Sequence, residues 1–200
     1  MAESLAAEII RDGRLDIRLN QRERFRWEFE VQNDNGTAVD LTSSTVEFFL
    51  KPVDLSLEPR VTLTNAIDAS ETGPVDVSTI PMTFPDKGFI KVDDEVIRFD
   101  ERTSNQLDSL TRAADETSAA AHLAVATATL AGRIIDEDGP ANEQLILDEA
   151  NGLITVYISQ PTLNNFRWLK AEYRLQMIDS FGDPEILCCG FATFEKRWAQ

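Results

Sequence analysis

A two-residue alternation of apolar and polar side chains is the feature that most limits how this chain can fold. Leu15, Ile17 and Leu19 alternate with charged residues, and the alternation returns over residues 25–31. Successive side chains of a β-strand point to opposite faces, so this period gives each strand one apolar and one polar face. The pattern predicts half-buried β-strands over both segments.

Three aromatic side chains, Phe25, Trp27 and Phe29, share the apolar face of the second segment. Such a stripe could stack against sugar rings, but aromatics that alternate with charged residues are more typical of the inner face of a β-sandwich. We therefore expect them in the core. The run Asn33-Asp34-Asn35-Gly36 that follows predicts a hairpin turn, because Asn and Gly tolerate a positive φ.

Further strands are predicted near both ends of the chain, and the segment between them differs from the ends in its residue pattern. Turn clusters separate the strand candidates, which are residues 46–50, 145–147, 153–158, 173–178 and 186–194. In the middle, residues 89–92 and 95–99 predict a compact hairpin around Asp93-Asp94. The Ala-rich residues 113–131 leave helix and strand open, because their Thr residues weaken the helix propensity.

The fold class that follows is mainly β: an antiparallel β-sandwich interrupted by a small inserted β domain. We assign residues 14–65 and 133–200 to the sandwich and residues 66–132 to the insert. Residues 1–13 form an N-terminal arm, in which residues 3–11 have the apolar spacing of a short helix. A chain of 200 residues can bury about 70% of its unfolded surface, which allows a substantial core.

Acidic residues outnumber basic ones, with 35 Asp and Glu against 19 Lys and Arg, and the formal net charge is −16. Binding to nucleic acid or to an anionic membrane depends on Lys and Arg, so we expect neither partner. No apolar run approaches the length of a membrane span, and the first residues lack the pattern of a signal peptide. We therefore expect synthesis in the cytoplasm.

The reactive side chains do not form a catalytic or metal-binding pattern. His122 is the single histidine, which excludes a multi-histidine metal site, and we expect it to make structural hydrogen bonds inside the insert. Cys188 and Cys189 are adjacent in a predicted strand, so their side chains should point to opposite faces. No nucleophile elbow or glycine-rich nucleotide motif is present. We predict no catalytic residue, no cofactor site and no metal site.

Carboxylates and two tryptophans are the remaining candidates. Residues 136–139 lack the ligand spacing of a calcium loop and predict a turn. Residues 93–95 could approach a cation, but consecutive hairpin side chains diverge. Acidic pairs are too abundant in this chain to single out a glycosidase pair. Trp168 and Trp198 fit no strand pattern, and we expect both to be exposed and available for contacts with other subunits.

Residues 84–122 carry an ordered set of short motifs, which are Phe84-Pro85, Gly88, Ile90 to Ile97, Leu110-Thr111-Arg112 and Thr117 to His122. In order and spacing they resemble a module of structural proteins of tailed bacteriophages, in which Ala113, Glu116 and Val125 would be glycines. The chemistry of these residues is architectural. Pro85 and Gly88 suit an entry turn, and Arg112 can bridge carbonyls or a carboxylate within the hairpin.

The flanking segments resemble immunoglobulin-like domains of phage tail and baseplate proteins, over residues 25–29, 39–42, 173–176 and 187–191. The resemblance implies an immunoglobulin-like sandwich in a non-enzymatic virion protein of a tailed phage, placed in the tail or baseplate. Its implied partners are other phage structural proteins and copies of itself. Two alternatives stay open: a host-glycan-binding module that uses Trp168 or Trp198, and a hydrolytic enzyme that uses scattered carboxylates.

Overall fold

The computed structural model describes residues 5–9, 13–21 and 23–195. The chain is mainly β, with 50% strand and 4% helix, as the sequence predicts. It divides into two compact units. Residues 1–53 and 135–200 form one, here called the sandwich unit, and residues 54–134 form the other, the inserted unit.

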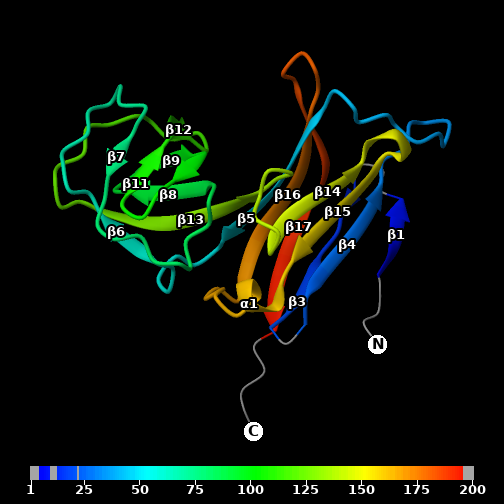
Figure 1. Ribbon diagram of the computed structural model, residues 1–200, viewed down its shortest axis with the longest axis horizontal. Helices are drawn as coiled ribbons and strands as arrows, with labels where there is room; N and C mark the ends of the chain where they lie inside the picture. The colour runs from blue at the N-terminus through cyan, green and yellow to red at the C-terminus, as the bar shows by residue number, and fades with distance from the viewer. Residues whose placement is uncertain (1–4, 10–12, 22, 196–200) are drawn as a thin grey trace, which may run out of the picture. The chain divides into compact units, whose positions relative to one another are not determined.

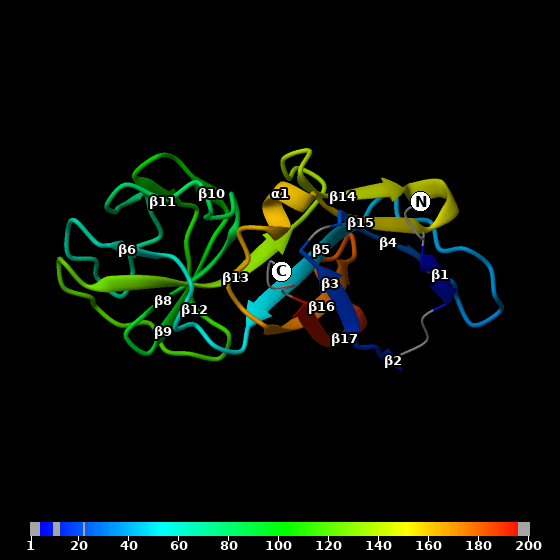
Figure 2. The same cartoon turned by 90° about the horizontal axis from the view of Figure 1, so that it is seen from below.

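The sandwich unit contains two sets of paired strands, which lie on opposite sides of its core (Figures 1 and 2). One sheet has the order β1 (Leu5–Ile9), β4 (Phe25–Glu30), β15 (Leu153–Ile158), β14 (Glu143–Asp148). The other has β5 (Thr45–Pro52), β16 (Lys170–Ile178) and β17 (Pro184–Glu195), and β17 also pairs with β2 (Gly13–Arg14) and β3 (Ile17–Asn20). The pairs of β4 with β15, of β14 with β15, of β16 with β5 and of β16 with β17 are antiparallel, whereas β1, β2 and β3 pair in parallel.

The aromatic stripe of β4 lies in the core of the sandwich unit, which confirms the core prediction against a sugar platform. Phe25, Trp27 and Phe29 are each at least 93% buried. The Trp27 ring meets the opposite sheet edge-on, with ring centroids 6.5 Å from Phe48 and 5.6 Å from Tyr173. This geometry is favourable for aromatic pairs, so the stripe joins the two sheets.

The segment before β3 is held against β17 by a close backbone approach. The Tyr173 hydroxyl donates a hydrogen bond to the Leu15 carbonyl and lies 3.2 Å from Cys188 Sγ. A Cβ on Gly190 would lie 2.1 Å from the same carbonyl oxygen, so only glycine permits this contact. Cys188 is buried and Cys189 is exposed, which confirms that they occupy opposite faces.

The inserted unit has its own strands and its own apolar core. One sheet runs β12 (Thr111–Ala114), β9 (Glu95–Phe99), β8 (Gly88–Val92), β13 (Thr127–Ile135), and β6 (Arg60–Thr62) also pairs with β13. A smaller sheet runs β10 (Glu101–Arg102), β11 (Gln106–Asp108), β7 (Val75–Asp76). The predicted β8–β9 hairpin around Asp93-Asp94 is confirmed. Its residues Ile90, Val92 and Ile97 are buried in the core of this unit, as expected.

One expectation about local structure is wrong, and one open assignment is settled. Leu5–Ile9 is a strand rather than a helix, because it pairs with the backbone of β4; residues 1–4 and 10–12 lie outside the described part of the chain. The Ala-rich segment contains no helix: β12 ends at Ala114, irregular turns follow, and β13 begins at Thr127. Pairing of β13 with both β6 and β8 outweighs the propensity of its alanines.

The boundary of the inserted unit also differs from the sequence assignment. It lies at residue 54 rather than 66, because Val61 and Leu63 are buried in the core of the inserted unit. Two short helices were not expected: a 3-10 turn at Glu149–Asn151 and α1 (Gln160–Leu163), which Ser159 caps. In the described residues, no helix has the length and apolar character needed to span a membrane.

Replacing residues 54–134 with a short Gly/Ser linker should leave a sandwich unit that unfolds cooperatively. Leu50 and Ile135 flank the insertion and pack in one core cluster, so a short loop can join them at small entropic cost. All three tryptophans lie outside 54–134, and thermal unfolding followed by tryptophan fluorescence therefore measures this unit alone.

The control is replacement of residues 66–131 only. It keeps Val61 and Leu63 without the core that buries them, and it should bind more of a dye that reports exposed apolar surface. The absence of a cooperative transition in the first variant would refute the two-unit architecture.

Candidate functional site

Four charged or titratable side chains of the inserted unit meet in one place, here called the charged cluster: Asp93, Glu95, Arg112 and His122. Asp93 sits in the β8–β9 turn, Glu95 begins β9 and Arg112 lies on β12. His122 belongs to the irregular segment before β13, and its backbone pairs with Ile67. The short hairpin thus places two acids beside side chains that are distant in sequence.

Glu95 and Arg112 form a buried, two-point ion pair. The Arg112 Nε and Nη2 atoms donate to Glu95 Oε1 and Oε2 at 2.8 and 2.7 Å. Their side chains are 0% and 7% exposed. Arg112 also donates to the backbone carbonyls of Asp68, Glu71 and Ala120. The expectation that Arg112 bridges carbonyls or a carboxylate is confirmed in both respects.

His122 lies between two carboxylates. Its Nε2 atom is 2.8 Å from Glu95 Oε2 and its Nδ1 atom is 2.9 Å from Asp93 Oδ2. A ring N–H donates to a carboxylate oxygen, so the imidazole bridges the two acids. The imidazole is buried, which confirms the predicted hydrogen-bonding role of His122 inside the insert.

Glu95 stays ionised in spite of its burial. Burial raises the pKa of Glu95, but hydrogen bonds from Arg112, from the backbone N–H groups of Ala120 and Ala113, and from His122 lower it to about 2. Hydrogen bonds to the charged form outweigh the loss of hydration. The cluster therefore holds an ionised Glu95 between Arg112 and His122.

The inserted unit contains several left-handed backbone positions that are not glycine. Six described residues other than glycine have a positive φ, and all lie in the inserted unit. Ala113, Glu116 and Val125 are among them, with φ of 56°, 61° and 64°. These are the positions where the resembling phage module would carry glycine. The left-handed turns are therefore present here without the residue that adopts them at least cost.

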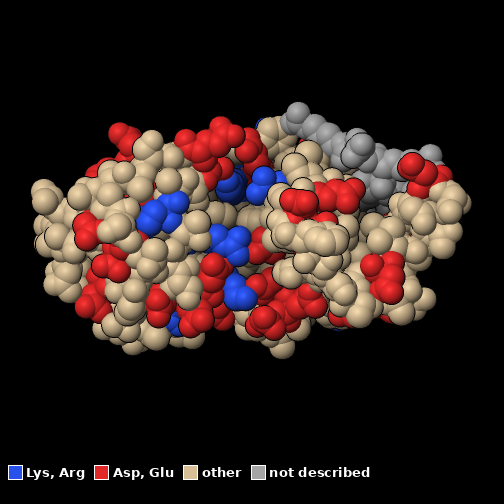
Figure 3. Space-filling model, turned by 90° about the horizontal axis from the view of Figure 1, so that it is seen from above, with Lys and Arg blue, Asp and Glu red and all other residues tan. Residues whose placement is uncertain are grey.

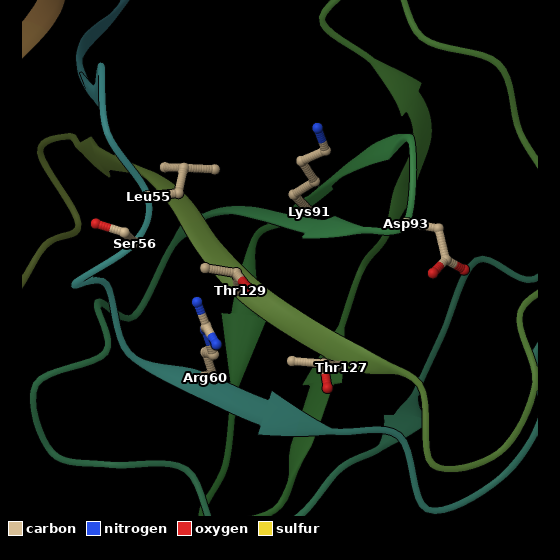
Figure 4. Close-up of a pocket in the computed structure, with 7 residues that line it drawn as sticks. All are labelled: Leu55, Ser56, Arg60, Lys91, Asp93, Thr127 and Thr129. Carbon is tan, nitrogen blue, oxygen red and sulfur yellow. The ribbon is translucent and has the colours of Figure 1, made fainter.

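A shallow, open pocket of about 420 Å³ adjoins the charged cluster (Figure 4). Asp93 belongs to both. The rest of the lining comes from the outer face of β6, β13 and β8 and from the segment before β6: Leu55, Ser56, Arg60, Lys91, Thr127 and Thr129. Sequence analysis did not single out this pocket, because its members come from strands that are remote in sequence.

The other candidate residues do not gather into a site. Trp168 is 3% exposed and stacks on Phe166 at 5.2 Å, so the prediction that it is exposed is wrong. It packs into the sandwich core with Phe194. Trp198 lies outside the described residues. Residues 136–139 form a turn, as predicted, closed by a hydrogen bond from Gly139 N–H to the Asp136 carbonyl.

The described part of the chain contains no group of three or more His, Cys, Asp or Glu residues placed to hold a metal ion. The divergence expected of residues 93–95 is wrong for Asp93 and Glu95: their carboxylates approach the same imidazole ring, although Glu95 is buried and the Asp93 side chain is 70% exposed. What the sequence did not reveal is that His122 lies between them. No known protein family, curated protein or solved structure matches this chain.

Replacing Glu95 with Gln should destabilise the inserted unit by about 3 kcal/mol at pH 7, because Arg112 and His122 lose a buried partner. The Glu95 pKa is lowered on folding from 4.5 to about 2. Its contribution is therefore full above pH 4.5 and is lost as the pH falls toward 2. The stability difference between wild type and Glu95→Gln should disappear over that interval.

Urea unfolding measures this effect if far-ultraviolet circular dichroism is compared with tryptophan fluorescence. The inserted unit has no Trp or Tyr, so the unfolding step that fluorescence does not detect belongs to it. Glu101→Gln removes the same charge from an exposed strand position and is the control. A pH-independent difference for Glu95→Gln would contradict the role assigned to the ion pair.

Replacing Val125 with Gly should stabilise the inserted unit by about 0.5–1 kcal/mol, because relief of the left-handed strain exceeds the entropy cost of glycine. Val125 is 78% exposed, so little packing is lost. The control is Leu123→Gly at a similarly exposed position that lacks a positive φ. It should destabilise by a comparable amount in the same urea experiment. Equal effects of the two changes would show that Val125 is not strained.

Proposed function

We propose that this protein is a non-enzymatic structural component of a tailed-phage virion, placed in the tail or baseplate and working through contacts between subunits. The observation that carries the proposal is that the side chains of the charged cluster are engaged in structural hydrogen bonds. Glu95, Arg112 and His122 are buried, and each is engaged in hydrogen bonds that hold the turns of the inserted unit. The same residues carry the resemblance to the phage module.

Exposed apolar side chains support a role in subunit contacts. Phe181 is 89% exposed, Met82 is 96% exposed and Leu57 is 64% exposed. Isolated exposed apolar residues are common, but a large aromatic at the tip of a hydrogen-bonded turn is typical of a contact residue. The immunoglobulin-like assignment of the sandwich belongs to the same proposal, and the two-sheet arrangement agrees with it.

The glycan-binding alternative has less support. A sugar platform needs an accessible aromatic face, and Trp168 is buried against Phe166 and Phe194. The pocket beside the charged cluster has no aromatic residue in its lining. We therefore place subunit contact ahead of glycan binding.

The test is the location of the protein in particles. Tailed particles produced by cells that carry its gene should contain the chain by mass spectrometry, and antibody-gold labelling should mark the tail or baseplate in electron micrographs. An antibody against a major capsid protein is the control for labelling. Purified particles that lack the chain, or label confined to unassembled material, would overturn the proposal.

A further inference from the structure

Two cations of the inserted unit stand side by side without an acidic partner. Arg60 on β6 and Lys91 on β8 both pair in register with Thr129 of the strand between them. Neighbouring strands are about 5 Å apart, so the Cα atoms of the two cations are about 10 Å apart on one face. Figure 4 shows both side chains rising from that face, with Thr129 between them.

The two cations line the shallow pocket described above, here called the Arg60–Lys91 groove. Arg60 and Lys91 are exposed and form no ion pair with any described residue. Asp93 also lines the groove, and its Oδ2 atom lies 2.9 Å from His122 Nδ1. With two cations and one acid in its lining, the groove carries a net positive charge in a chain of net charge −16.

The same chain carries a surface of complementary character at the turn between β16 and β17. Asp179 Oδ1 accepts hydrogen bonds from the backbone N–H groups of Phe181 and Asp183, which fixes the turn. The turn projects from the sandwich unit (Figure 1). It presents Phe181 together with the exposed acids Asp183 and Glu185, which form no ion pair with a described residue.

We propose that the β16–β17 turn of one copy of this chain docks on the Arg60–Lys91 groove of a second copy. Asp183 and Glu185 occupy alternate positions, about 7 Å apart in extended backbone, and the long side chains of Arg60 and Lys91 can meet both. Phe181 would find apolar surface at Leu55, which lines the groove, and at the exposed Leu57. This inference deepens the proposed function and rests on it.

The overall negative charge does not prevent such a contact. On the face in Figure 3, patches of Asp and Glu are spread among uncharged residues, and Lys and Arg form a few smaller patches. At physiological salt, charges are screened beyond about 8 Å, so the paired groups at the contact dominate over distant repulsion. Because turn and groove are different surfaces, the contact can form reciprocally in a two-fold dimer or repeat head-to-tail in a ring or filament.

Charge exchange between the two surfaces tests the proposal by sedimentation velocity on the full chain, from about 10 μM to about 1 mM. The groove variant is Arg60→Glu with Lys91→Glu, and the turn variant is Asp183→Lys with Glu185→Lys. Each should weaken self-association at least about tenfold relative to wild type. The four changes combined in one chain should restore it, since the charges are complementary again.

The matched control is Arg18→Glu with Arg26→Glu, which alters net charge as the groove variant does but at exposed positions of the sandwich unit. It should associate like wild type. A wild-type chain that stays monomeric throughout, or a folded four-change variant that fails to regain association, would overturn the inference. Circular dichroism verifies folding of each variant.

A galacturonic acid oligomer serves as a probe for the competing occupant, an acidic glycan. The wild-type chain could stay monomeric and yet bind this oligomer saturably, with the binding lost in the groove variant. That result would show that the occupant of the groove is an acidic glycan and not a second copy of the chain. Failure of the inference is distinguishable from failure of the proposed function. A chain found in particles but monomeric in solution refutes only the docking, and one that associates but is absent from particles refutes only the virion role.

Discussion

The carboxylate of Glu95 is the group on which the organisation of the inserted unit depends. It accepts hydrogen bonds from Arg112, from His122 and from the backbone N–H groups of Ala113 and Ala120. Through these partners one buried charge fixes two segments, strand β12 and the irregular residues before β13. A buried ion pair contributes little net stability compared with an apolar replacement, but removing one partner is costly. The cluster therefore specifies a conformation more than it adds to stability.

The charged cluster lies next to the Arg60–Lys91 groove on the surface of the inserted unit. Glu95 is engaged by Arg112 and Asp93 contacts His122, whereas the neighbouring Arg60 and Lys91 lie exposed on the outer face of the sheet. The interior network and the basic groove are thus two sides of the same β8–β9 hairpin. The sandwich unit is built differently, since its two sheets are joined by aromatic contacts such as that of Trp27 with Tyr173.

Regular strands were predictable where both signals, period and turn chemistry, agreed. Residues 153–158 were predicted as a strand and are β15 over the same residues. The prediction failed where the local pattern was ambiguous or the partner was remote. The helix spacing of residues 3–11 gave way to pairing with β4. Trp168 showed no strand pattern, yet Phe166 and Phe194 enclose it.

The amino-acid sequence by itself determined the class of the fold, the hairpin around Asp93-Asp94 and the roles of Arg112 and His122, because side-chain period and turn residues act over a few positions. Tertiary structure decided that His122 lies between Asp93 and Glu95, that Arg60 and Lys91 share Thr129 as a neighbour, and that the insertion starts at residue 54. These features depend on strand register between distant segments. Register is set by which faces become buried together, and no local pattern contains that information.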